Sequence, residues 1–257
     1  MQLNDFCFMP YSDNRDDYRD FVARSAIDEN WGPEKRYLQQ YLSANFEIAY
    51  EQGKVKVNEE KGYALWRAGN LVTRDAQPIT LLGVKNHVSG KQPYFFKFVF
   101  TGERFSIEID GEKIPETAPE PPTYAVPAYH GDYKLSYNFT HYLDDHAERA
   151  GEVFPNLNEH QRFLCIYAAL NLSHIRHQNT AVAQWYKDKN ADSGTYQWLL
   201  PLHVKSGNIS DKPDLVATLD PVDEYQEYSV RTLLPPEWAY PKARAVSQRD
   251  PHFRSWA

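Results

Sequence analysis

The sequence predicts an α+β protein: a single domain with a mixed, mainly antiparallel sheet packed on a long central helix. Two observations lead to this prediction. Residues 158–189 keep a helical period over their whole length and contain no Pro or Gly. Short strand-like stretches occur in groups before and after them, as in α+β chains. We expect residues 1–19 to be an N-terminal segment and residues 20–257 to form the domain, because a chain of this length can bury a full core.

The long helical stretch is the element around which we expect the other elements to pack. It carries two apolar faces, and a helix that is apolar on two faces is usually buried between other layers. Polar residues interrupt both faces in the second half, where they either pair inside the core, the more frequent case, or line a cavity. One face contains Leu164, Ala168, Asn171, Ile175, Gln178, Val182 and Trp185, and the other contains Phe163, Ile166, Leu170, His177, Ala181 and Gln184.

The other elements follow from alternation and from turn residues. Pro33 opens a helix in the favoured first-turn position, and Pro236 starts a short helix that ends at Val246. Asp110-Gly111 is typical of a hairpin turn, and Gly69-Asn70 marks a turn or bulge. Residues 115–127 contain five prolines and predict an ordered crossover or a lid. Strands are expected at 54–57, 63–67, 79–84, 94–100, 105–109, 133–140, 195–204, 215–219 and 228–234.

Composition excludes several classes of protein. The net charge of −7 argues against a globally basic nucleic-acid binder, although it leaves room for a local basic groove. The two cysteines, Cys7 and Cys165, fit neither a disulfide framework nor a zinc cluster, so a cytoplasmic location is expected. No apolar run is long enough for a transmembrane helix and residues 1–10 do not resemble a signal peptide, so no membrane association is expected.

Familiar catalytic motifs are missing from the sequence. It has no phosphate-cradling glycine loop, no nucleophile elbow and no metalloprotease motif. His174 and His177 are spaced so that they could offer two metal ligands, but no second ligand pair stands at a matching spacing, so no metal and no cofactor is expected. Asp144 and Asp145 are adjacent, so their side chains diverge and do not predict a paired-carboxylate site.

A more coherent set of polar residues is spread over the second half of the chain. A histidine such as His141 can carry a proton near neutral pH, and arginines can hold a phosphate or carboxylate through two hydrogen bonds. Amide and hydroxyl groups can fix the orientation of a ligand, and an aromatic ring can stack a base. The alternative is that the arginines form ordinary ion pairs. The set consists of His141, Arg149, His177, Gln184, Tyr240 and Arg244, with Trp185 or Tyr186 as the aromatic ring that stacks a base.

Short sequence motifs are spread over nearly the whole chain, from Asp20 to Ala257. They are Thr232-Leu233-Leu234, Glu237-Trp238-Ala239-Tyr240, Ala243-Arg244-Ala245-Val246, Trp256, Thr180-Ala181-Val182, Gln184-Trp185-Tyr186, Leu199-Leu200-Pro201-Leu202 and Asp214-Leu215, with His141 and Arg149. Together these motifs resemble the family known as domain of unknown function 3825. This chain departs from the family pattern at four positions, because the family usually has Asp at Glu237, Asn at His177 and Lys242, and Pro at Ala183.

The resemblance implies a role connected with RNA, because members of this family are often joined to cold-shock or S1-like nucleic-acid-binding modules. One hypothesis is an intracellular enzyme that acts on RNA or on a nucleotide, with His141 as acid/base and Arg149 and Arg244 as phosphate ligands. The other is a non-catalytic module that binds RNA or a partner protein, or senses a nucleotide. In a third reading the arginines only brace the terminal helix against the sheet. The expected partner is RNA or a nucleotide.

Overall fold

A computed structural model describes residues 1–10, 17–137, 147–176, 181–187, 194–205, 208, 211–247 and 256. The chain divides into two compact units, Met1–Tyr124 and Ala125–Ala257, which are described one at a time. Their boundary falls within the proline-rich segment that the sequence predicted to be a crossover or lid. The assignment of residues 20–257 to one domain stays a prediction.

The α+β class is confirmed, but the strands do not form one sheet. They form two mixed five-stranded sheets, one in each unit, and a separate two-stranded sheet. The expectation of a single sheet on a central helix was wrong because alternation identifies a strand and its buried face but not the strand with which it pairs.

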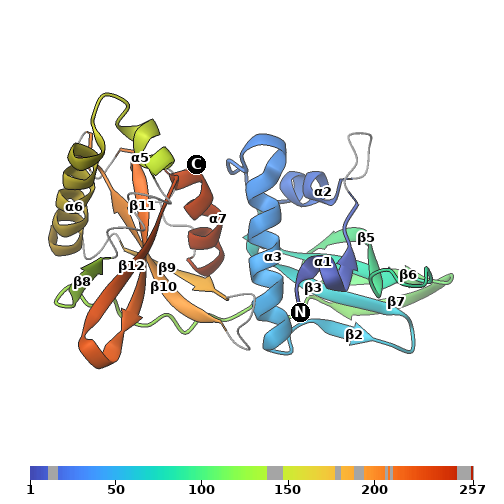
Figure 1. The fold of residues 1–257 in the computed structure, drawn as a ribbon. Helices are drawn as coiled ribbons and strands as arrows, with labels where there is room; N and C mark the ends of the chain where they lie inside the picture. The colour runs from blue at the N-terminus through green and yellow to red at the C-terminus, as the bar shows by residue number, and fades with distance from the viewer. Residues whose placement is uncertain are drawn as a thin grey trace. The chain divides into compact units, whose positions relative to one another are not determined.

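The first unit is a sheet with helices on one face (Figure 1). The strand order is β1-β5-β4-β3-β2, and only β1 pairs in parallel, with β5. α3 packs on β3, α2 packs on β5 and α1 packs on α3. The bounds are α1 Leu3–Phe6, β1 Cys7–Phe8, α2 Tyr18–Ser25, a 3-10 turn Pro33–Lys35, α3 Arg36–Glu51, β2 Lys56–Asn58, β3 Tyr63–Val72, β4 Pro78–Lys85 and β5 Tyr94–Thr101.

A hairpin of β6 (Arg104–Ile109) and β7 (Glu112–Thr117) packs against the same sheet. Its turn is the predicted Asp110-Gly111 pair, and both residues have positive φ, as a two-residue hairpin turn requires. Ile107 of the hairpin packs with Leu65 of β3, whereas the next residue, Trp66, packs on Phe46 of α3. Because successive side chains of a strand point to opposite faces, the hairpin and α3 cover opposite faces of the sheet.

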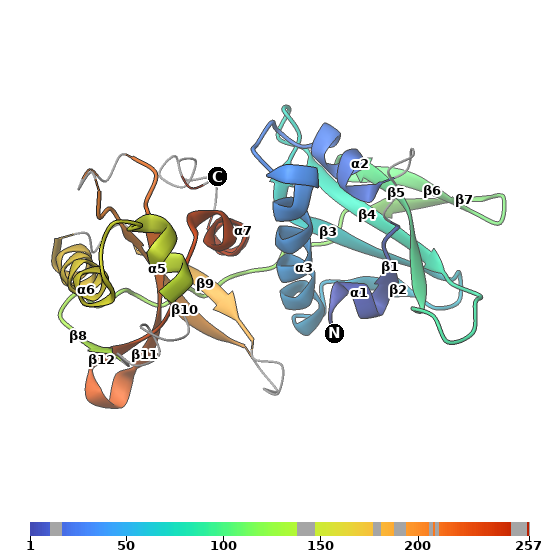
Figure 2. The ribbon, with the colours of Figure 1, turned by 45° about the horizontal axis from the view of Figure 1, so that its top comes forward.

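The second unit is a sheet between helices (Figures 1 and 2). The strand order is β8-β12-β11-β10-β9, with only β8 parallel to its neighbour. α6 packs on β10, and α7 packs mainly on β9 from the other face of the sheet. The bounds are β8 Lys134–Tyr137, α5 Ala147–Val153, α6 Glu159–Arg176, β9 Val182–Tyr186, β10 Thr195–Leu202, β11 Leu215–Val222, a 3-10 turn Asp223–Tyr225, β12 Glu227–Leu234 and α7 Pro236–Val246.

The central helix is shorter than the predicted range of residues 158–189. The described helix spans Glu159–Arg176, and Val182–Tyr186 form strand β9, antiparallel to β10 with Gln184 opposite Gln197. Val, Trp and Tyr favour strands, and a short apolar run cannot be assigned to helix or strand by periodicity alone. Pairing with β10, which is encoded farther along the chain, therefore decided the structure of this segment.

α6 is not buried on both faces as expected. Leu164, Leu172 and Ile175 lie on one side of it and are 47–67 % exposed. The opposite side, with Ile166 and Leu170, packs on the sheet. Among the described residues, no helix has both the length and the apolar character needed to cross a membrane.

Candidate functional site

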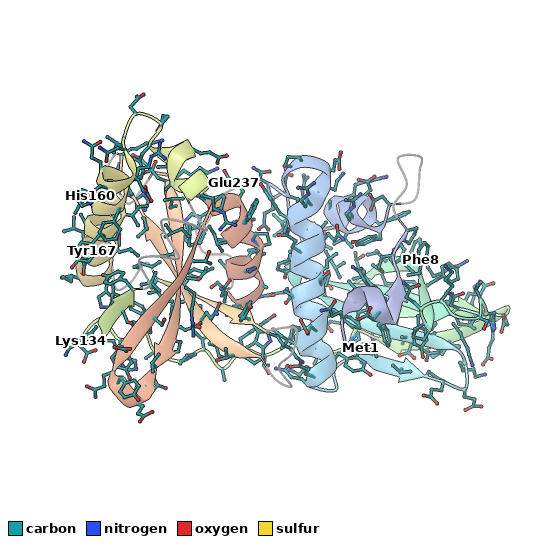
Figure 3. The ribbon with its side chains drawn as sticks, viewed as in Figure 1. Met1, Phe8, Lys134, His160, Tyr167 and Glu237 are labelled. Carbon is teal, nitrogen blue, oxygen red and sulfur yellow. The ribbon has the colours of Figure 1, made fainter. Side chains whose placement is uncertain are left out.

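A cavity of about 380 Å³ in the second unit collects charged side chains from three segments. α5 contributes Arg149 and Glu152, the segment leading into β11 contributes Lys205, Lys212 and Asp214, and the first turn of α7 contributes Glu237. Pro213, Pro235 and Pro236 form part of its wall. Figure 3 shows Glu237 at the start of α7, beside α5.

Arg149 is anchored at this cavity by the end of β12. Its Nη1 donates to the carbonyl oxygen of Leu233 at 2.6 Å, and its guanidinium carbon lies 5.1 Å from the centre of the Trp238 ring. A guanidinium has five N–H donors, and no carboxylate lies within ion-pair distance of Arg149 among the described residues. Its plane is therefore fixed while most of its donors stay available for a ligand.

The two lysines of the cavity already have acidic partners. Lys212 Nζ donates to Glu237 Oε1 at 2.7 Å, which joins the segment before β11 to the start of α7. Lys205 Nζ lies 3.9 Å from Asp214 Oδ1, while Asp214 Oδ2 accepts hydrogen bonds from the backbone N–H groups of Val204 and Lys205. Asp214 therefore holds the backbone of the segment in place. Among the described residues, Arg149 is the cation of the cavity whose charge is least neutralised by its neighbours.

Gln184 and Tyr186 lie on β9 and do not line this cavity. Gln184 is 1 % exposed, and its amide nitrogen donates to Gln197 Oε1 at 2.7 Å. Its own Oε1 has no hydrogen-bond partner among the described residues. Lys242 of α7 lies 6.0 Å from the centre of the Tyr186 ring, and burial lowers the pKa of its amine. These residues form a second polar cluster under α7.

Tyr240 and Arg244 are both buried on α7. Arg244 Nη1 donates to the carbonyl oxygen of Ser247 at 3.4 Å, a contact within the end of its own helix. Neither residue lines the cavity around Arg149, so the structure does not bring the two predicted phosphate ligands, Arg149 and Arg244, to one described cavity.

His141 and His177 lie outside the described residues. Their predicted neighbour His174 is buried in the core, where Tyr129 Oη lies 2.6 Å from Nδ1 and the carbonyl oxygen of Tyr133 lies 2.6 Å from Nε2. A carbonyl oxygen can only accept, so Nε2 donates and Nδ1 accepts from Tyr129. With both nitrogens bonded, His174 is not available as a metal ligand, and the described residues contain no cluster of three metal-binding side chains.

Sequence reasoning missed several residues of the cavity. Glu152, Lys205 and Lys212 are ordinary surface residues by their local pattern, and no motif connects them. The sequence analysis named Glu237 and Trp238 only as part of the motifs that resemble the family. Four residues of the cavity belong to the motifs that carry the family resemblance: Arg149, Asp214, Leu215 and Glu237. The sequence could have indicated the cavity only through these motifs.

The comparisons with known proteins give one match. The model of the family described as Domain of unknown function (DUF3825) matches residues 22–253, which span both compact units. The chain belongs to this family. No curated protein and no solved structure matches it.

Proposed function

We propose that this member of the DUF3825 family binds a nucleotide or RNA in the cavity of its second unit, with Arg149 as the phosphate ligand. The proposal rests mainly on the Arg149 guanidinium, which the Leu233 carbonyl oxygen holds at the cavity. This guanidinium keeps N–H donors that are available for a ligand, and it has no carboxylate partner among the described residues. A phosphate offers several strong acceptors to the guanidinium fork. The cavity volume lies near the lower end of the range for small-molecule sites, roughly 300–1,000 Å³.

The lysines support the same function. Lys205 and Lys212 are each only partly engaged, because Lys205 is 3.9 Å from its carboxylate and Lys212 is 44 % exposed at its side chain. An entering phosphate can take these side chains from Asp214 and Glu237 without leaving a buried charge unpaired.

The proposal has a catalytic form. In it, His141 is the acid/base for a reaction at the phosphate that Arg149 binds. Gln184, Tyr186, Tyr240 and Arg244 do not line the cavity, so this form gives them no contact with the ligand there. Turnover of RNA or a nucleotide that is lost in a His141→Ala variant, while binding persists, would support this form. Binding without turnover across a nucleotide and RNA panel favours a sensor or binding module.

The test is calorimetric titration of the purified chain with nucleoside monophosphates and short RNAs. Arg149→Ala is expected to weaken binding about tenfold or more, since a charge-assisted hydrogen bond contributes about 1.5–3 kcal/mol. Arg149→Lys is expected to recover only part of this loss, because an ammonium cannot form the two parallel hydrogen bonds of a guanidinium.

Arg231→Ala is the matched control. It also removes one positive charge from the second unit, but Arg231 lies on β12 and pairs with Asp220, away from the cavity. Its affinity is expected to equal that of the unmodified chain. A folded Arg149→Ala variant that binds as tightly as the control would refute the proposed function.

A specific observation favours a second candidate, association with a second copy of this chain. The side of α6 with Leu164, Leu172 and Ile175 is apolar and exposed. A neutral apolar stripe can pack against a second copy of itself in a two-fold arrangement. A concentration-dependent dimer in analytical ultracentrifugation that Ile175→Asp abolishes would support this candidate, and a monomer at all concentrations would end it.

A further inference from the structure

We infer that the cavity around Arg149 takes one phosphate-bearing nucleotide at a time, either free or at the end of a strand, and excludes the interior of a strand. This inference rests on the proposed function. It assigns the class of ligand from three properties of the site: its volume, the carboxylates at its rim and the exposed ring beside it.

The volume sets the first limit. A cavity of about 380 Å³ has room for a single nucleotide-sized molecule. Proteins that bind single strands instead use a basic groove that follows the backbone over several nucleotides. The charged residues here converge on one cavity, and the chain carries a net charge of −7, which repels the rest of a long polyanion.

The carboxylates set the second limit. Glu152, Asp214 and Glu237 line the same cavity as Arg149. In the interior of a strand every nucleotide is followed by another phosphate, and such a phosphate would approach one of these carboxylates at an unfavourable energy. A free nucleotide, or the nucleotide at the 3′ end of a strand, instead presents both its 2′ and 3′ hydroxyl groups, and carboxylates are good acceptors for the hydroxyls of a ribose. Glu152 is the best placed for this role, since it has no partner among the described residues.

The third property is an aromatic surface beside the phosphate ligand. Trp238 is 52 % exposed, and the Arg149 guanidinium lies over its ring. Stacking of a base on an aromatic side chain contributes about 1–3 kcal/mol. A nucleotide whose phosphate is bound by Arg149 therefore has a surface for its base next to the cavity. The base of an interior nucleotide is already stacked on both neighbours and gains less.

The experiment compares three ligands of the full chain by calorimetry: adenosine 5′-monophosphate, a linear RNA hexamer with a 5′-phosphate, and the same hexamer closed into a circle. We expect the circle to bind at least tenfold more weakly than the tighter of the other two. Tight binding of the monophosphate alone identifies a free nucleotide as the ligand, and tight binding of the linear hexamer identifies a strand end; both outcomes support the inference.

A circle that binds as tightly as the tighter of the other two ligands overturns the inference but leaves the proposed function standing. If none of the three binds, both are refuted. The two failures are therefore distinguishable within one set of titrations.

Two variants test the assigned roles. Trp238→Ala is expected to lose about tenfold in affinity for the tighter ligand, whereas Trp238→Phe stays within about threefold, because a smaller ring still stacks. Tyr225→Ala is the matched control, since Tyr225 is also an exposed aromatic residue of this unit but lies in the turn before β12, whereas Trp238 lies under the Arg149 guanidinium. Glu152→Gln is expected to improve binding of the circle severalfold, because it removes one of the repelling charges. Equal losses in Trp238→Ala and Tyr225→Ala, or unchanged exclusion of the circle in Glu152→Gln, count against the assignment.

Discussion

Two buried amides, one in each unit, differ in how completely they are bonded. Asn45 on α3 is 1 % exposed; its nitrogen donates to the Tyr41 carbonyl at 2.9 Å, and its oxygen accepts from Tyr124 Oη at 2.7 Å. Gln184 on β9 is buried to the same degree, but its Oε1 has no partner among the described residues. An unpaired buried oxygen costs about 1–3 kcal/mol. The comparison indicates that both polar atoms of the Asn45 amide contribute to the stability of the first unit, whereas the Gln184 oxygen is a polar group that the stability of the second unit does not require.

Two sets of charged groups show a similar contrast. In the first unit Glu116 of β7 accepts hydrogen bonds from Lys56 and Tyr63, which joins the hairpin to the main sheet. In the second unit Arg149 and Glu152 line a cavity without ion-pair partners among the described residues. Charges that are not needed for folding are available for a ligand.

The largest expected effect is in the first unit, at Gly69. This residue has φ +57°, and a Cβ there would lie 2.4 Å from Asn45 Oδ1 and 2.5 Å from Tyr41 Oη. Gly69→Ala combines backbone strain with displacement of these bonded groups and is expected to lower the free energy of unfolding by about 3 kcal/mol, measured by urea denaturation.

Gly53→Ala is its matched control. Gly53 also has positive φ, but nothing lies within 4 Å of a Cβ at that position. Only the backbone cost remains, about 1 kcal/mol. Equal effects of the two substitutions would show that the network around Asn45 is not rigid.

A smaller effect is expected from Glu116, and it depends on pH. Burial alone would raise the pKa of this carboxyl, but the hydrogen bonds from Lys56 and Tyr63 outweigh it and lower the pKa below its ordinary value. A lowered pKa in the folded protein stabilises the fold above the unfolded-state pKa, and this contribution is lost as pH falls through the folded-state pKa. Glu116→Gln is expected to be less stable at neutral pH and to lose less stability on acidification than the unmodified chain, measured by denaturation between pH 7 and pH 3. Parallel pH profiles of the two proteins would contradict the assignment.

The smallest effect is expected at Gln184. Gln184→Met keeps the length of the side chain and removes the unpaired oxygen, but it also removes the hydrogen bond to Gln197. These changes oppose each other, so the free energy of unfolding is expected to change by less than about 1 kcal/mol. A loss of 3 kcal/mol or more, as is typical of a broken buried network, would place Gln184 in the same structural class as Asn45.

Local sequence determined a large part of this protein. Alternation of residue types located most strands, and Asp110-Gly111 predicted its turn because few residues accept positive φ at both positions. The irregular register of β3 occurs between Arg67 and Val72, where Gly69-Asn70 indicated a turn or bulge. Pro236 marked the start of α7 for an equally local reason, its fixed φ and missing N–H.

Only the tertiary structure decided which elements meet. Residues 182–186 fit a helical period, yet they form a strand because Thr195–Leu202 lies beside them and satisfies their backbone hydrogen bonds. The prediction of a single sheet was wrong for the same reason, because the sequence of a strand does not specify the strand with which it pairs. Arg149, Asp214 and Glu237 were visible in the sequence as separate residues, and their convergence on one cavity depends on how α5, the segment before β11 and α7 pack around the end of the sheet. Local geometry follows from neighbouring residues, whereas a site is made by side chains that are distant in sequence, and only the packed fold fixes the distances between them.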